Sequence, residues 1–202
     1  MKADAPTTSA QNINARIAGR VASLRRELTL SLDELAEKCA VSRSMISLIE
    51  RGESSPTAVV LEKISAGLGV PLSSLFTDSE APANPLSRRT DRTPWRDPQS
   101  GYIRCNISPT NFSSPIQIVE VHLPAGASVA YETGVRDVPL HQQIWIQEGT
   151  IQFTLGETTY TLTEDDCLAM QLNAPTTFRN RTRKPAHYIV VTASERSRPP
   201  RR

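Results

Sequence analysis

The sequence of 202 residues has few cysteines, few aromatic side chains and no long apolar run. Its three cysteines, Cys39, Cys105 and Cys167, form no CxxC motif, which argues against a disulfide framework or a zinc-thiolate site. We expect them to be buried thiols in a reducing compartment. No run approaches the ~18 apolar residues that span a bilayer. Residues 1–12 lack the apolar segment of a secretory signal, so we expect a cytoplasmic protein with no membrane partner.

Neither sign of charge is in large excess. The 23 Lys and Arg residues oppose 21 Asp and Glu residues, which gives a formal net charge of +2. Residues 1–80 carry 9 basic and 10 acidic groups, and therefore a net charge of −1. Any binding of nucleic acid must depend on where single cations are placed rather than on overall charge. A hydrophobic content of 38% excludes a wholly disordered chain.

The hydrophobic period changes once along the chain. Apolar residues recur with helical spacing from Ile13 to Phe76, and mostly with strand spacing from about Tyr102 to Val191. The segment between them is rich in proline and poor in apolar residues, which is typical of a linker. We therefore expect a disordered N-terminus (1–12), a first domain (13–76), a linker (77–96), a second domain (97–193) and a basic tail (194–202).

The first domain is predicted to contain five short helices. The S-x-x-E pattern from Ser31 to Glu34 is a capping box that begins the second helix at Leu32. Ser42 is placed to cap the third helix. Only residues 39–41 separate these two helices, and so short a turn is typical of a helix-turn-helix unit.

The third helix carries the candidate DNA contacts. In a helix-turn-helix unit the second helix enters the major groove, with the residues near its N-terminus facing the base edges. Ile46 and Ile49 are expected to face inward, and Arg43 can donate two hydrogen bonds to a guanine. A protein-interaction bundle is the alternative, although a face of small polar side chains suits protein contacts poorly. The predicted DNA-binding residues are Ser42, Arg43, Ser44, Ser47 and Arg51.

The run SLDELAEKCAVSRSMISLIERGESSPT, residues 31–57, resembles the XRE-type, phage-repressor-like DNA-binding family. The resemblance extends over residues 24–76 and implies a salt bridge that ties Arg25 on the first helix to Glu50 on the third. It also implies double-stranded DNA as the partner. One short helix buries little surface, so we expect a homodimer on a near-palindromic operator. Ala40 departs from the family's usual glycine in the turn, and a left-handed backbone there would cost ~1 kcal/mol.

The second domain is predicted to consist of many short strands. Residues 151–155 alternate between apolar and polar, and Gly156 and Glu157 turn the chain into residues 158–162, which indicates a hairpin. Strands at this spacing are typical of a sandwich or a barrel. The other strand candidates are residues 116–123, 141–147, 167–172, 176–179 and 188–192.

Residues 142–149 and the run PTTFRN, residues 175–180, resemble the cupin family of small jelly-roll barrels. The resemblance covers roughly residues 100–192, but the metal ligands that it implies are missing. Gln142 stands in the place of the family's glutamate and Thr176 in the place of a histidine. The spacing of His122, His141 and His187 does not supply substitutes. We therefore expect no metal, no cofactor and no catalytic residues.

A barrel without a metal can still hold one small molecule. Strand alternation places Gln142, Thr176 and Phe178 inside, whereas Ile144 and Ile146 are expected to pack the core. Gln142 and Thr176 are polar although they stand where the family has metal ligands, which favours a polar effector. We expect an anionic effector if Arg136 also faces inward. The predicted effector-binding residues are Arg136, Gln142, Met170, Thr176 and Phe178.

The sequence thus predicts an α+β multidomain protein. An all-α, five-helix helix-turn-helix domain is followed by an all-β cupin (jelly-roll) barrel. The function that we expect is a DNA-binding transcriptional regulator, not an enzyme, whose barrel dimerises and senses a small metabolite. Two alternatives stay open, namely a metal-dependent cupin enzyme with a DNA-binding appendage and a barrel that only dimerises.

Overall fold

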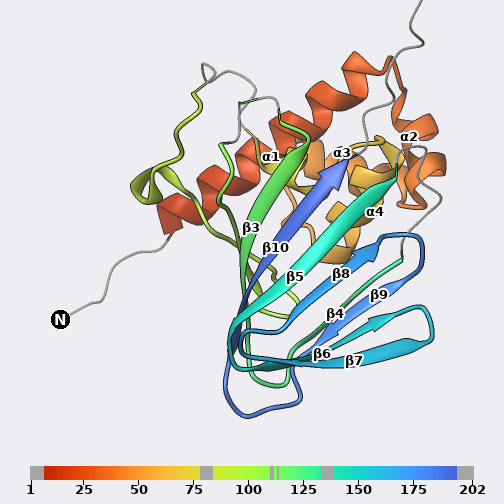
Figure 1. The fold of residues 1–202 in the computed structure, drawn as a ribbon. Helices are drawn as coiled ribbons and strands as arrows, with labels where there is room; N and C mark the ends of the chain where they lie inside the picture. Colours follow the sequence, from red (N-terminus) through yellow and green to blue (C-terminus); the bar gives the residue numbers. More distant parts are fainter. Residues whose placement is uncertain (1–6, 78–83, 110–111, 113, 133–138, 195–202) are drawn as a thin grey trace, which may run out of the picture.

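The computed structural model describes residues 7–77, 84–109, 112, 114–132 and 139–194. The helices precede the strands and lie together at one end of the long strands (Figure 1). No helix in the described ranges is long and apolar enough to cross a membrane. The helices are α1 (Thr7–Glu27), α2 (Leu32–Cys39), α3 (Arg43–Glu50), α4 (Ala58–Gly67), and the 3-10 helices η1 (Leu72–Phe76) and η2 (Arg89–Asp91). Below, residues 7–77 are called the helical part and the described residues from 84 onward the β-rich part.

The prediction of five helices is wrong in one place. The helical part contains four α-helices, and the expected fifth is the 3-10 helix η1. Its Ser74 amide donates to the Pro71 carbonyl over 2.9 Å, an i to i+3 bond, and five residues are too few for an α-helical ladder. At the other end, α1 begins at Thr7, six residues before the expected Ile13.

The turn between α2 and α3 forms as the sequence indicates. Ser31 and Glu34 make the predicted capping box, with the Ser31 amide donating to Glu34 Oε2 over 2.7 Å and the Glu34 amide donating to Ser31 Oγ over 3.1 Å. Ala40 ends α2 with φ of 50° and ψ of 41°, the left-handed conformation that favours glycine. The family usually has glycine at this position. Ala40 therefore adopts the strained left-handed conformation that the sequence analysis considered for it.

The strands form two antiparallel sheets. The six-stranded sheet has the order β1-β2-β3-β10-β5-β8, and the four-stranded sheet has the order β4-β9-β6-β7. Ile144 and Ile146 on β5 and Phe153 on β6 are completely buried between the two sheets. The strands are β1 (Trp95–Arg96), β2 (Ile103–Asn106), β3 (Ile116–Leu123), β4 (Ser128–Tyr131), β5 (Leu140–Glu148), β6 (Thr150–Leu155), β7 (Thr158–Thr163), β8 (Cys167–Gln171), β9 (Thr176–Arg179) and β10 (Ala186–Ser194).

The β-rich part is the all-β domain that the sequence predicts, but its barrel is not closed. Among the described strands none pairs from one sheet to the other, so the sheets stack as a sandwich. Side chains from both inner faces interdigitate and bury each other, which removes the need for closure. Strands β1, β2 and β4 are additional to the strands that the sequence predicts.

The helical and β-rich parts pack directly on each other. Trp95 on β1 lies in the segment predicted as a linker, yet it is 2% exposed and packs edge-to-face on Phe76 of η1, with 5.6 Å between ring centroids. Arg16 Nη2 donates to the Phe76 carbonyl over 3.0 Å, and Asn106 Nδ2 donates to the Ser73 carbonyl over 3.2 Å. Helix η1 is thus held from both sides of the interface.

Asp97, which is 3% exposed, connects the two parts through the start of α4. Its Oδ1 accepts a hydrogen bond from the Ala58 amide over 2.8 Å, and its Oδ2 accepts from the Ser100 amide over 2.7 Å. The β-rich part therefore supplies a negative cap to the N-terminus of a helix in the other part, where the helix dipole favours an anion.

Replacing Asp97 with alanine is expected to lower the free energy of unfolding by about 1–2 kcal/mol, the usual cost of losing a helix cap. Urea denaturation followed by circular dichroism measures the loss. The control is Asp91→Ala, which removes an exposed carboxylate in η2 that accepts a hydrogen bond from the neighbouring Thr90 hydroxyl. Equal stability of both variants would contradict the capping role.

Candidate DNA-binding surface and ligand cavity

Helix α3 presents the predicted polar face. Ile46 and Ile49 are buried against the helical core, and Ser42 caps the helix by accepting a hydrogen bond from the Met45 amide over 3.3 Å. The Oγ atoms of Ser42 and Ser44 lie 3.2 Å apart. The structure brings all the predicted DNA-binding residues to one exposed or half-buried face: Ser42, Arg43, Ser44, Ser47 and Arg51.

The two arginines on this face differ in how firmly they are held. Arg43 Nε lies 3.3 Å from Asp33 Oδ1, and both side chains are more than half exposed. Arg51 makes a bidentate pair with Glu53, with distances of 2.9 and 2.8 Å, and its Nη1 donates to Ser47 Oγ over 2.6 Å. Arg43 is therefore the more available cation, since an exposed pair with one long contact contributes little.

A less exposed ion pair fixes α3 against α1. Arg25 Nε and Nη2 donate to Glu50 Oε1 and Oε2, each over 2.7 Å, and Arg25 Nη1 donates to the Leu30 carbonyl over 2.9 Å. The side chains are only 16% and 11% exposed. Hydrogen bonds to Glu50 raise the pKa of Arg25. This is the salt bridge that the family resemblance implied.

A cavity lies where the helical part meets the β-rich part. Its volume is about 80 Å³, enough for several waters or a small organic molecule. Its wall is formed by Glu62, Pro71, Leu72 and Ser73 of the helical part and, in the β-rich part, by Tyr102, Arg104, Val121, Val129, Tyr131, Leu140, Gln142, Leu172, Thr176, Phe178, Tyr188, Val190 and Thr192.

Three of the predicted effector-binding residues line this cavity. Gln142, Thr176 and Phe178 all belong to its wall, and Gln142 Nε2 donates to Thr192 Oγ1 over 3.1 Å. Met170 is partly buried against the core but is not part of the wall. Arg136 lies outside the described residues.

Arg104 on β2 is a cavity residue that the sequence analysis does not predict. This side chain lines the cavity with its guanidinium carbon 5.4 Å from the centroid of the Phe76 ring. Its Nε is buried and has no hydrogen-bond partner among the described residues. The available signal was the alternation of Tyr102 and Arg104 with apolar neighbours, but β2 is too short to stand out. Glu62 is the other charged residue of this wall, and Arg104 is the group in it that can pair with an anionic ligand.

Tyrosine hydroxyls add neutral donors to the same wall. Tyr131 Oη donates to Tyr102 Oη over 3.4 Å. Burial raises the pKa of Tyr131 and of Tyr188 well above the usual value, so both stay protonated at neutral pH. Protonated hydroxyls beside a guanidinium can donate to a carboxylate or another oxyanion.

Comparison with known proteins identifies the helical part. A helix-turn-helix family model, HTH_3, matches residues 21–75. The control protein C.MunI of a Mycoplasma species is 43% identical over 70 residues, which are 34% of this chain and 95% of that protein. The HTH-type transcriptional regulator SutR of Escherichia coli is 38% identical over 71 residues, or 35% of this chain. That match spans only 40% of SutR.

The whole fold also has a counterpart among solved structures. The crystal structure of an HTH_3 family transcriptional regulator from Vibrio cholerae superposes with a TM-score of 0.76. The superposition covers 93% of this chain and 99% of that chain, at 24% sequence identity. The same order of a helical part followed by a β-rich part therefore occurs in a second protein.

Proposed function

Because the chain belongs to the XRE-type (HTH_3) helix-turn-helix family, we propose that it is a transcriptional regulator that binds double-stranded DNA and responds to a small molecule in the cavity. The observation that carries the proposal is the exposed serine and arginine face of α3, residues 42–51, held against α1 by the Arg25–Glu50 pair. In this proposal residues 13–76 are the DNA-binding domain and residues 97–193 are the sensor domain.

The N-terminal turn of α3 would read the DNA. Ser42 and Ser44 are short enough for the backbone to approach phosphates, and Arg43 is long enough to reach a guanine edge. One short helix supports only weak binding, so we propose a homodimer that reads a near-palindrome. Exposed apolar side chains on the outer face of the six-stranded sheet, Ile116 and Trp145, offer the second copy a surface to cover.

The cavity would receive the effector. Its wall includes residues of α4 and η1 as well as strands, so a molecule that fills it touches both parts of the protein. A ligand with different affinities for two arrangements of these parts shifts the balance between them. Arg104 and the nearby tyrosines favour a small organic anion. The alternative of a metal-dependent enzyme is less well supported, because the matched relatives are a control protein and a transcriptional regulator.

Replacing Arg43 with alanine is expected to weaken binding to the preferred operator by about 1–3 kcal/mol, which is about 5- to 150-fold, and to relax base preference at one position in each half-site. The operator is first selected from a random duplex pool with the wild-type chain. Binding is then measured by fluorescence anisotropy at fixed salt, because phosphate contacts depend on ionic strength.

The matched control is Arg183→Ala, which removes an exposed arginine in the loop between β9 and β10. It should leave operator affinity unchanged. An equal loss for Arg43→Ala on all duplexes would show that Arg43 contacts only phosphate. A wild-type footprint of one half-site with one chain per duplex would contradict the dimer.

A further inference from the structure

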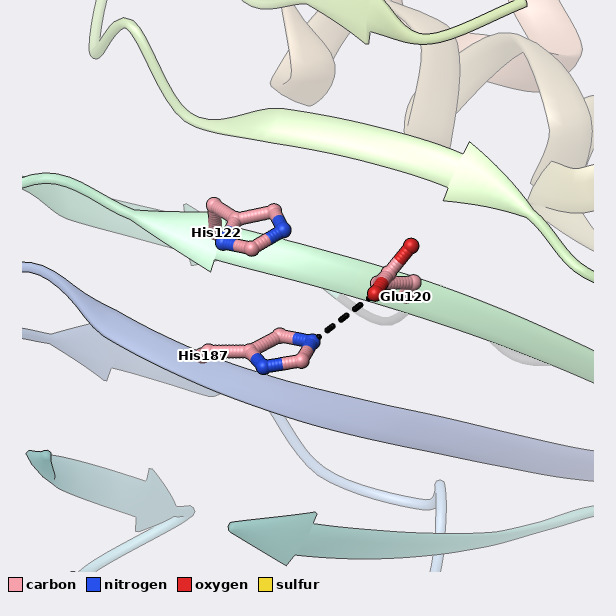
Figure 2. A group of neighbouring side chains, drawn as sticks. All are labelled: Glu120, His122 and His187. Carbon is pink, nitrogen blue, oxygen red and sulfur yellow. Dashed lines mark hydrogen bonds and ion pairs between the residues drawn. The ribbon is translucent and has the colours of Figure 1, made fainter. Parts of the chain in front are cut away.

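Three potential metal ligands meet on the outer face of the six-stranded sheet. Glu120 and His122 lie on β3, and His187 lies on β10 directly opposite His122 in the antiparallel register (Figure 2). Alternate residues of the same strands, Val121 and Tyr188, point into the cavity. Because successive side chains of a strand point to opposite faces, the cluster is separate from the cavity.

The geometry of the cluster is close to that of a metal site. His187 Nε2 lies 3.0 Å from Glu120 Oε1, and the two imidazole rings stack with 4.4 Å between centroids and an interplanar angle of 8°. One ligand atom from each residue lies within 4.8 Å of the others. Zinc bonds of 2.0–2.2 Å place tetrahedral ligand atoms about 3.3–3.6 Å apart, so small side-chain rotations are sufficient.

Within the cluster, one contact is a hydrogen bond, between His187 and Glu120, and the other is a ring stack, between His187 and His122. The Glu120–His187 hydrogen bond alone would explain two members of the cluster, but it gives His122 no polar partner of its own. A shared cation would give all three side chains one partner.

We propose that Glu120, His122 and His187 bind one divalent transition-metal ion per chain, with zinc as the ion best suited to two imidazoles and one carboxylate. Three protein ligands leave a fourth tetrahedral position for water. All three come from the paired strands β3 and β10, whose register holds their backbones at fixed separations. The site differs from the position of the missing cupin ligands, because Gln142 and Thr176 line the cavity on the other face.

The test is titration of tag-free, full-length protein with zinc chloride by isothermal calorimetry after treatment with a chelator. Wild-type protein is expected to bind one equivalent. Glu120→Gln, His122→Gln and His187→Gln should each weaken binding at least tenfold. Cobalt(II) gives an independent readout, because a tetrahedral complex absorbs visible light and each variant should lose that absorption. Circular dichroism without metal verifies that the variants fold.

Two control variants make the test specific. His141→Gln removes the remaining histidine, which lies farther along the outer face on β5, and Cys167→Ser removes the exposed thiol. Both should keep one equivalent of zinc with unchanged affinity. The proposal is overturned if wild-type protein takes up no zinc, if binding survives in all three cluster variants, or if it is lost only with Cys167→Ser.

Discussion

Replacing Glu50 with alanine is expected to lower the free energy of unfolding by about 3 kcal/mol. In the wild-type structure the Arg25 side chain is 16% exposed. The variant leaves its guanidinium without the carboxylate that accepts two of its hydrogen bonds at 2.7 Å. Only the bond from Arg25 to the Leu30 carbonyl would persist. A poorly solvated charge without its partner costs more than the pair contributes, so the loss exceeds that of a surface ion pair.

The matched control for this variant is Glu53→Ala. Glu53 accepts two hydrogen bonds from Arg51 with nearly the same bidentate geometry, but both side chains are more than half exposed. Water screens that pair, so its removal should change stability little. Urea denaturation monitored by circular dichroism compares the two variants. Similar losses for both would show that partial burial does not strengthen the Arg25–Glu50 pair.

The parts of the fold that follow from short-range signals were predictable. The capping box of Ser31 and Glu34, the cap at Ser42 and the inward positions of Ile46 and Ile49 depend on residues a few positions apart, and all are found in the structure. The Arg25–Glu50 pair is longer in range and was implied by family resemblance alone. Local hydrogen bonding fixes a helix start, so a single sequence contains the necessary information.

The parts that depend on strand register were not predictable. The sequence spacing of His122 and His187 matches no ligand motif, yet antiparallel pairing of β3 with β10 places them opposite each other. The cavity wall likewise combines η1 with strands that are distant in the sequence. Such neighbours are set by tertiary packing, for which hydrophobic periodicity provides no signal.

Replacing Arg104 with alanine is expected to weaken binding of an anionic effector at least 30-fold, the equivalent of about 2 kcal/mol or more for a desolvated charge pair. Arg104 is the cation of the described cavity wall, and its buried Nε has no hydrogen-bond partner among the described residues. A bound oxyanion would supply that partner. A panel of small carboxylates and sulfonates is first screened by thermal shift, and the strongest hit is titrated calorimetrically.

Two variants separate the charge of Arg104 from its packing on Phe76, 5.4 Å away. Arg104→Lys retains the cation and should restore part of the affinity, whereas Arg104→Gln retains a polar side chain without charge and should not. Gln142→Leu removes a neutral hydrogen-bonding group and should cost less, up to about tenfold. If anions bind equally well to wild type and Arg104→Gln, the charge does not select the ligand. If only neutral compounds stabilise the wild type, the effector is not an anion.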